Sequence, residues 1–215
     1  MIDSTLTWHN HIDTISKKMS RAIGLLYKIR PLVNIKIMKT LYYSLIYPHL
    51  IYAIEVWGSA GITVLNTLLI LQKRIVRLLT YSDARQSDYS FPSSNPLFFK
   101  EQLLKVQDIF KMRIAQFIYN CLNKTCPVNF HLWFKLTTQI HRHNTRSQYI
   151  DIDKLITSNN LFIPTARTSH YGLKLIKVQG PKIWNEIPPL IRNINSSKIF
   201  IKNLKKIMIE SYNSQ

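Results

Sequence analysis

The sequence predicts a mainly α-helical protein, with a helical module over residues 1–125 and a small mixed α/β region over residues 126–215. Apolar residues recur at steps of three and four through most of the first 125 residues, which is the period of one helix face. Beyond Pro127 this pattern gives way to short apolar runs separated by polar segments. Because 46% of the 215 residues are hydrophobic, the chain can bury one core or two small ones.

The first element is predicted to be an amphipathic helix from about Trp8 to Arg30. Thr7 is a candidate N-cap, and Pro31 ends the helix because proline cannot continue it. The apolar stripe is Trp8, Ile12, Ile15, Met19, Ile23, Leu26 and Ile29. Three cations fall together on the opposite face: Lys17, Arg21 and Lys28.

A second helical region from about Ile35 to Trp57 contains Pro48, which should break or kink it. Its apolar stretch Leu41 to Gly58 is interrupted before it could span a bilayer, so we interpret it as core and expect no membrane partner. Aromatic residues at helical spacing are more often core than a base-stacking platform. These aromatic residues are Tyr42, Tyr43, Tyr47 and Tyr52.

Two further helices complete the predicted module. One runs from Thr63 to Thr80 and alternates leucines with the cations Lys73, Arg74 and Arg77. After a polar loop, a second is expected from Phe98 to Lys124. In the C-terminal region we expect a short helix in "FHLWFKL", a loop entering a strand in "HRHNTRSQYIDID", a short strand in "GLKLIKV" and a closing basic helix.

The residue types that carry catalysis or bind metals form no convincing site. Cys121, Cys126, His131, His141 and His143 are enough ligands for zinc, but their spacing is poor for a structural knuckle. On a strand, Asp151 and Asp153 would share a face, yet two solvated carboxylates explain them as well. The sequence has no phosphate-binding glycine loop and no nucleophile elbow. We therefore expect no catalytic residue, no bound metal and no cofactor.

Charge is the stronger signal. The chain has 29 Lys+Arg against 11 Asp+Glu, a net charge of +18 and a pI near 10.0, which favours RNA or DNA as a partner. A solvated helix face is the alternative explanation of each basic run. The two cysteines and the lack of a signal-like opening predict an intracellular protein, nuclear or cytoplasmic. The candidate nucleic-acid contacts are Lys17, Arg21, Lys28, Lys73, Arg74, Arg77, Arg142 and Arg146.

Five short motifs follow one another along the chain. The first is "LTWHNHIDTISKKMSRAIGLLYKIR", with Trp8 and His11 ahead of a basic helix. "LYYSLIYPHLIYAIEVWG" then ends in Trp57 and Gly58, and "LQKRIVRLLT" contains Gln72 and its basic neighbours. "HNTR" occupies residues 143–146. Last, "GPKIWNEIPPLIRN" contains Trp184, Asn185 and Pro188 and precedes a helix with Phe200, Leu204 and Lys205.

In this order the motifs resemble the region that follows the palm in reverse transcriptases of non-LTR retrotransposons (LINE elements) of the jockey-like group. The resemblance covers nearly the whole chain. It implies that the helical module is thumb-like, grips template and primer, and belongs to an RNA-directed DNA polymerase. Trp184 and Asn185 can also be explained simply as a buried anchor and a turn former.

The family's F-x-D-D catalytic motif is not among these residues. The resemblance implies a palm before Met1 that binds Mg²⁺, together with an endonuclease domain. We expect this chain to contact both domains but not to polymerise alone. The alternatives are a helical protein-interaction module without a nucleic-acid role, a zinc module, and a non-functional relic of the element.

Overall fold

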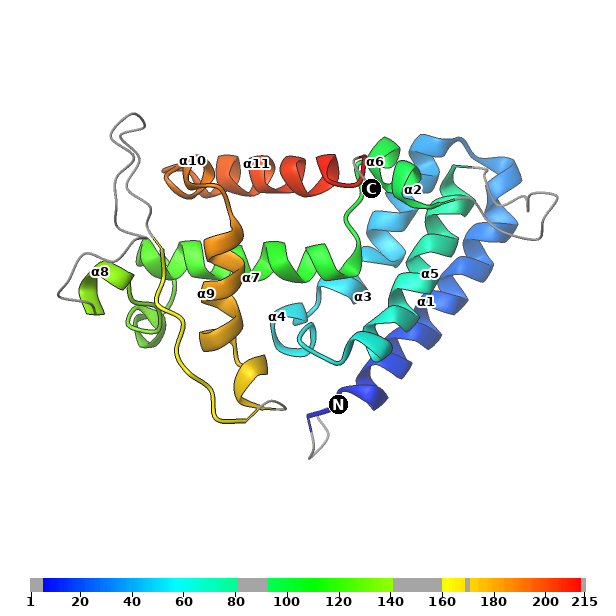
Figure 1. Ribbon diagram of the computed structural model, residues 1–215. Coiled ribbons are helices and arrows are strands. Elements are labelled where there is room, and N and C mark those ends of the chain that lie inside the picture. Colours follow the sequence, from blue (N-terminus) through cyan, green and yellow to red (C-terminus); the bar gives the residue numbers. More distant parts are fainter. Residues whose placement is uncertain (1–5, 81–92, 141–159, 169–170, 214–215) are drawn as a thin grey trace. The chain divides into compact units, whose positions relative to one another are not determined.

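A computed structural model describes residues 6–80, 93–140, 160–168 and 171–213, and over these residues the protein is mainly helical (Figure 1). The chain divides into two compact units. Unit 1 comprises residues 1–110 and 208–215, and unit 2 comprises residues 111–207. Both divisions fall inside helices, α7 and α11. The boundary that the sequence predicts at residue 125 lies within unit 2.

Unit 1 is built on two long helices, α1 (His9–Ile29) and α5 (Ile62–Leu79), which pack against each other and run in the same direction (Figure 1). Both were predicted within a residue or two. The predicted stripe of α1 is buried from Ile12 to Leu26. The Thr7 cap was wrong, because Trp8 takes the N-cap position in the left-handed conformation (φ 65°) and no side chain caps the helix.

Pro48 breaks the second helical region as predicted. The region forms α2 (Ile35–Leu45), α3 (Tyr47–Ile51) and α4 (Ile54–Trp57), with Pro48 in the first turn of α3, where a missing N–H costs least. The buried side chains here are Met38, Tyr42, Ile46, Leu50, Ile54 and Trp57. Among the described residues, no helix is both long and apolar enough to cross a bilayer.

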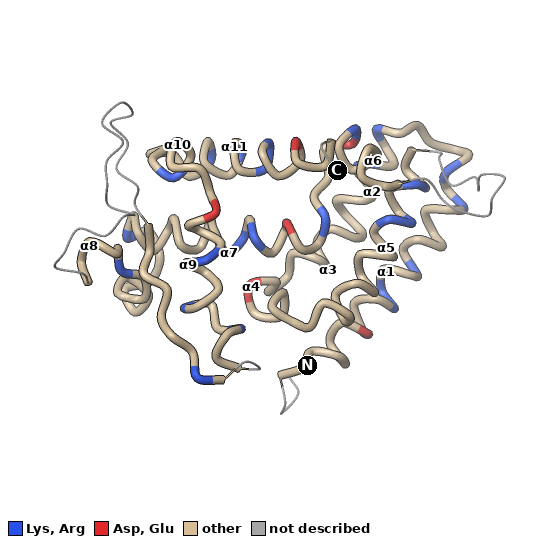
Figure 2. Tube along the Cα trace, viewed as in Figure 1, with Lys and Arg blue, Asp and Glu red and all other residues tan. Residues whose placement is uncertain are grey.

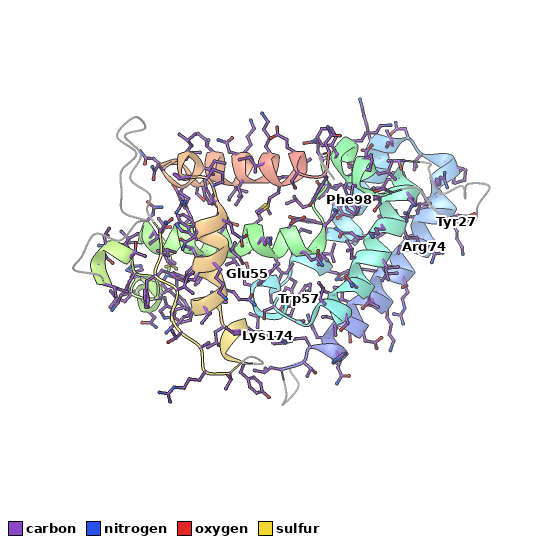
Figure 3. All side chains as sticks on the ribbon, viewed as in Figure 1. Tyr27, Glu55, Trp57, Arg74, Phe98 and Lys174 are labelled. Carbon is purple, nitrogen blue, oxygen red and sulfur yellow. The ribbon has the colours of Figure 1, made fainter. Side chains whose placement is uncertain are left out.

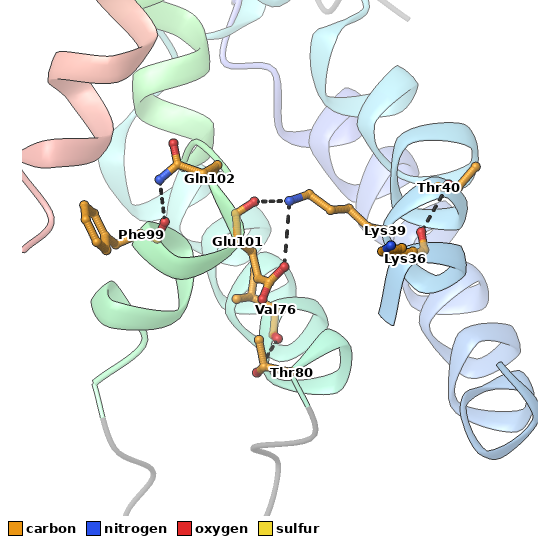
Figure 4. A network of polar contacts seen from close by, with 8 residues as sticks. All are labelled: Lys36, Lys39, Thr40, Val76, Thr80, Phe99, Glu101 and Gln102. Atoms are coloured by element: carbon orange, nitrogen blue, oxygen red, sulfur yellow. Dashed lines mark hydrogen bonds and ion pairs between the residues drawn. The ribbon is translucent and has the colours of Figure 1, made fainter. Parts of the chain in front are cut away.

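The single helix expected from Phe98 to Lys124 was wrong. It is two helices, α6 (Asn95–Glu101) and α7 (Val106–Leu122), because Gln102 adopts a left-handed conformation (φ 55°) that ends α6. Lys39 of α2 stabilises this end: its ammonium donates to the Glu101 carbonyl oxygen at 2.5 Å and lies 3.7 Å from the Glu101 carboxylate (Figure 4). A cation is favourable at a helix C-terminus.

The C-terminal residues of the chain belong to unit 1 and are tied to it by Tyr212. The buried Tyr212 hydroxyl donates to the Asp108 carboxylate and accepts from the Lys105 amide at 3.2 Å. The Lys105 ammonium lies 4.2 Å from the centre of the Tyr212 ring, and the Phe98 ring meets it edge-on. Burial and the Asp108 carboxylate both raise the pKa of Tyr212, so the phenol stays protonated and able to donate.

Unit 2 consists of shorter elements around the larger part of α7. These are η2 (Val128–Phe130), α8 (Thr137–Ile140), η4 (Gly172–Lys174), α9 (Ile176–Glu186), α10 (Pro189–Arg192) and most of α11 (Ser197–Glu210). Its core is aromatic: the Tyr119 and Phe200 rings stack at 4.7 Å, and the Trp184 ring lies 5.8 Å from Phe200. Gly180 lets α9 approach this core closely, since a Cβ there would lie 3.0 Å from Ile118.

Two predictions for this region were wrong. "GLKLIKV" forms η4 and the start of α9 instead of a strand, because Val178, Pro181 and Trp184 are buried at helical spacing. "FHLWFKL" is not a helix: after η2 the chain turns, and Leu136 forms an isolated antiparallel bridge with Leu161. That bridge is the only β structure in the described part of the chain, so the mixed α/β region is not observed there. "YIDID" lies outside the described residues.

Candidate nucleic-acid interface

Three residues of the N-terminal motifs meet in unit 1, although they lie up to 49 positions apart in the sequence. The His11 ring lies between two indoles, 6.2 Å from Trp8 and 5.8 Å from Trp57. Trp57 is buried, and its Nε1 donates to the Tyr52 carbonyl oxygen at 2.7 Å (Figure 3). The cluster joins the start of α1 to α4.

His11 is a packing residue in this cluster. Burial, more than the nearby positive charge of Lys18, lowers the pKa of its imidazole. Its Nε2 is buried and meets no hydrogen-bond acceptor among the described residues. A neutral ring between two indoles fits this environment, and nothing around it resembles an acid–base pair.

Gln72, the first residue of the "QKR" motif, is a buried polar hub. Its amide donates to the Leu104 carbonyl oxygen at 2.8 Å and to the Tyr42 hydroxyl at 3.3 Å, and accepts from the Val106 amide at 2.9 Å. It therefore satisfies backbone groups of the segment that joins α6 to α7. The sequence pattern placed Gln72 on the apolar face of α5 but gave no sign of this role.

Gly58, at the end of the Trp57 motif, is required by close packing. A Cβ there would lie 2.3 Å from a ring carbon of Phe110 and 2.5 Å from the Ile54 carbonyl oxygen. The motif residues of unit 1 thus serve folding, and any interface must be formed by other side chains.

The C-terminal motif has the same character in unit 2. The Trp184 side chain is buried, and the adjacent Asn185 amide pairs with both backbone groups of Leu161: Oδ1 accepts from N at 2.8 Å, and Nδ2 donates to O at 2.9 Å. The side chain therefore imitates a neighbouring β-strand. Pro188 is extended (ψ 138°) and opens α10.

The predicted cations of α1 are exposed as expected. Lys17, Arg21 and Lys28 all lie on the solvent face of α1, opposite its buried stripe. Lys17 also pairs with Asp13 one turn earlier, at 2.7 Å between Nζ and the carboxylate. Both side chains are more than half exposed, so the pair is weak and leaves Lys17 able to exchange partners.

The predicted cations of α5 lie beside those of α1. Arg74 is exposed, whereas Lys73 and Arg77 are half-buried. Burial lowers the pKa of Arg77, but a guanidinium stays charged at neutral pH. Because α1 and α5 are parallel neighbours, their C-terminal ends, which carry Lys28 and Arg77 in their last turns, lie together (Figure 2).

We call these six residues, Lys17, Arg21, Lys28, Lys73, Arg74 and Arg77, the α1–α5 basic surface. The structure adds an aromatic residue to it that sequence reasoning missed. Tyr27, next to Lys28, is 63% exposed and lies at the same end of unit 1 as Arg74 (Figure 3). An exposed aromatic ring beside cations can stack on an unpaired base.

Several other cations have structural roles. Lys39 binds the end of α6, Lys105 covers the Tyr212 ring, and Lys177 lies 4.5 Å from the centre of the Trp133 ring. The buried Arg192 donates to the Asn160 side chain at 2.8 Å. It lines a cavity of about 350 Å³ in unit 2 with Tyr119, Trp184, Asn193 and Asn195. Positive charge alone therefore does not identify an interface.

The remaining candidates lie outside the described residues. These are Arg142, Arg146, His141, His143, Asp151 and Asp153. Within the ranges that the structure describes, no three His, Cys, Asp or Glu side chains gather as a metal site would need. Cys121, Cys126 and His131 are all described and form no such group.

Comparison with known proteins returned no matching family model, no matching curated protein and no matching solved structure.

Proposed function

We propose that this chain is the nucleic-acid-binding, post-palm part of a non-LTR retrotransposon reverse transcriptase, and that the α1–α5 basic surface grips template and primer. The observation that carries the proposal is the grouping of exposed cations at the C-terminal ends of two parallel helices. Chemistry in such a polymerase would come from a palm with Mg²⁺, so the role assigned to this chain is binding.

The way the motif residues pack supports the first half of the proposal. Trp8, His11 and Trp57 form one cluster, and Asn185 clamps Leu161. Residues with such demanding neighbours are those that a shared fold would retain. The motif order in the sequence is then explained by one folded framework.

The chemistry of the α1–α5 basic surface supports the second half. Lysine and arginine contact phosphates, and each neutralised phosphate releases condensed counterions, so affinity falls with salt. The lone acid beside the surface on α1, Asp13, forms only an exposed pair with Lys17. No base-reading geometry is present in the described residues, so we expect binding with little sequence preference.

A salt titration with matched variants tests this interface. Binding of a primer–template with a single-stranded overhang is followed by fluorescence anisotropy for the wild type and the triple variant Lys17→Gln, Arg21→Gln, Lys28→Gln. Since each lost phosphate contact on duplex lowers the slope of log K against log salt by about 0.9, the triple variant should lose about 2 to 3.

The control removes the same charge elsewhere. Lys198, Lys202 and Lys206 are exposed on α11 and are changed to Gln together. The proposal expects the control to keep a slope close to that of the wild type. Equal losses in both triples would mean that net charge alone drives binding, and no binding by the wild type at low salt would reject the proposal.

Tyr27 provides a separate test of strand preference. Tyr27→Ala should weaken binding of single-stranded RNA or DNA by about 1–3 kcal/mol, with little effect on blunt duplex, because only unpaired bases expose a face for stacking. Tyr52→Ala is the matched control, since Tyr52 is exposed on another element and lies outside the α1–α5 basic surface. An equal loss on duplex and single strand would assign Tyr27 no stacking role.

A protein-interaction module is the second candidate. Three exposed apolar side chains follow one another from α3 to α5: Tyr52 at 73%, Val56 at 52% and Ile62 at 68%. Exposed apolar groups of this kind often mark a partner surface. Sedimentation of the purified chain distinguishes the candidates: a monomer that binds nucleic acid supports the first, whereas self-association abolished by Val56→Ser and Ile62→Ser supports the second.

A further inference from the structure

Unit 2 contains two thiols in direct contact. Cys121 is buried in the last turn of α7, and Cys126 is half-buried in the segment that follows. Their Sγ atoms are 3.3 Å apart, with both thiols reduced. Sulfur atoms in a disulfide are ~2 Å apart, so a small side-chain rotation would bring these two to bonding distance.

The backbone between the cysteines explains why they meet. Lys124 takes the left-handed conformation (φ 56°), its amide donates to the Cys121 carbonyl oxygen, and the Thr125 amide donates to the Asn120 carbonyl oxygen. This pair of hydrogen bonds is a Schellman motif, which reverses the chain at the end of a helix. Cys126 is thereby returned to the last turn of α7.

A second contact holds Cys126 from the other side. The Nε2 atom of His131 lies 2.7 Å from the Cys126 carbonyl oxygen, and because a carbonyl only accepts, this nitrogen carries the proton. The Phe117 ring meets the Phe130 ring edge-on at 5.4 Å and so holds the residue before His131 against α7. The second thiol is therefore fixed before any reaction.

We propose that Cys121 and Cys126 are a site of reversible thiol oxidation, at which a small-molecule disulfide such as oxidised glutathione closes an intrachain disulfide. The Cys126 thiolate attacks one sulfur of the reagent, giving a mixed disulfide and one released thiol. Cys121 then attacks the Cys126 sulfur and releases the second thiol. Two protein thiols are oxidised, one reagent disulfide is reduced, and the two protons leave on the released thiols.

The order of attack follows from the surroundings of the two sulfurs. Cys126 is partly accessible to the reagent, whereas Cys121 is 2% exposed. Burial, together with the contact to Cys126, raises the pKa of the Cys121 thiol to about 12. Cys121 is therefore slow toward reagents in solution and reacts through its neighbour, where proximity replaces reactivity.

Peptide mapping of the oxidised full-length chain tests this site. The native protein is treated with oxidised glutathione, the remaining thiols are alkylated, and the protein is digested with trypsin under non-reducing conditions. Because Lys124 lies between the cysteines, an intrachain disulfide joins two tryptic peptides. We expect this linked pair to be the main product, to revert with dithiothreitol, and to form faster in the native protein than in denaturant.

Single variants identify the two roles. Cys121→Ala should accumulate a stable glutathione adduct on Cys126, since no second thiol resolves it, whereas Cys126→Ser should leave Cys121 unmodified. Main products that are a wild-type adduct, an interchain dimer or modified Cys121 in the Cys126→Ser variant would overturn the proposal. The wild-type product decides the question even if a variant fails to fold.

Discussion

The two units are held together by different means. Unit 1 rests on the long parallel helices α1 and α5, whose apolar stripes recur with the helical period. Unit 2 has short elements, and polar side chains tie them to the backbone: Asn185 pairs with Leu161, and the Tyr119 hydroxyl donates to the Ile194 carbonyl oxygen at 2.8 Å. Periodicity describes the first kind of region well and the second poorly.

Removing the aromatic core of unit 2 should have the largest effect. Trp184→Ala deletes a buried ring beside Phe200 and should lower the free energy of unfolding by about 3–5 kcal/mol. Denaturant unfolding measures the loss. Trp133→Ala is the control, since that ring is only half-buried, and it should cost clearly less. Equal losses would mean that burial does not rank the aromatic residues of unit 2.

Gln72 should be the most sensitive polar residue of unit 1. Gln72→Met keeps the volume but leaves the Val106 amide and the Leu104 carbonyl buried without their partner. We expect a loss of about 2–4 kcal/mol, at about 1–3 kcal/mol for each unsatisfied group.

The control for Gln72 is Tyr42→Phe, which removes only its 3.3 Å hydrogen bond. That change should cost about 0.5–1.5 kcal/mol in the same denaturant assay. If Gln72→Met is as stable as the wild type, the hub has no stabilising role, and the α6–α7 connection is held by its apolar contacts alone.

A one-atom change tests the clamp of unit 2. Asn185→Asp keeps the acceptor for the Leu161 amide but replaces the donor to its carbonyl oxygen with a carboxylate oxygen. The repulsion should cost about 1–3 kcal/mol at neutral pH and less in acid, because protonation restores a donor. Asn195→Asp, at an exposed position, controls for the added charge. A loss independent of pH would contradict the paired geometry.

His11 should give the smallest effect, visible as a pH dependence. Its pKa is lowered in the folded state, so the unfolded chain binds the proton more readily. The stability contributed by neutral His11 is full above its ordinary pKa of about 6.5 and is lost as pH falls toward the folded value. His11→Phe should flatten the stability profile relative to the wild type over this window, and parallel profiles would contradict the burial of His11.

Much of unit 1 could be predicted from sequence. The stripe of α1, the extent of α5 and the break at Pro48 follow from helical spacing and from the missing proline N–H. The interruption after Glu101 could not be predicted, because it depends on the left-handed Gln102 and on hydrogen bonds from Gln72, about thirty residues away in sequence. Only tertiary contacts supply that information.

Unit 2 shows the limit more clearly. Seven residues of "GLKLIKV" satisfy an alternating pattern, yet they fold as η4 and the start of α9, because the helical spacing of Val178 and Trp184 extends past the segment. The exposed positions of Lys17, Arg21 and Arg74 were predictable from angle alone. Tyr27 was missed because periodicity does not give the exposure of a ring at the edge of a stripe.

Lysine footprinting tests the central claim most directly. The native chain is acetylated with and without a primer–template, and mass spectrometry gives the modification at each lysine. We predict protection of Lys17, Lys28 and Lys73 and unchanged labelling of the exposed Lys198, Lys202 and Lys206. Protection confined to α11, or equal at all six lysines, would contradict the α1–α5 basic surface as the nucleic-acid interface.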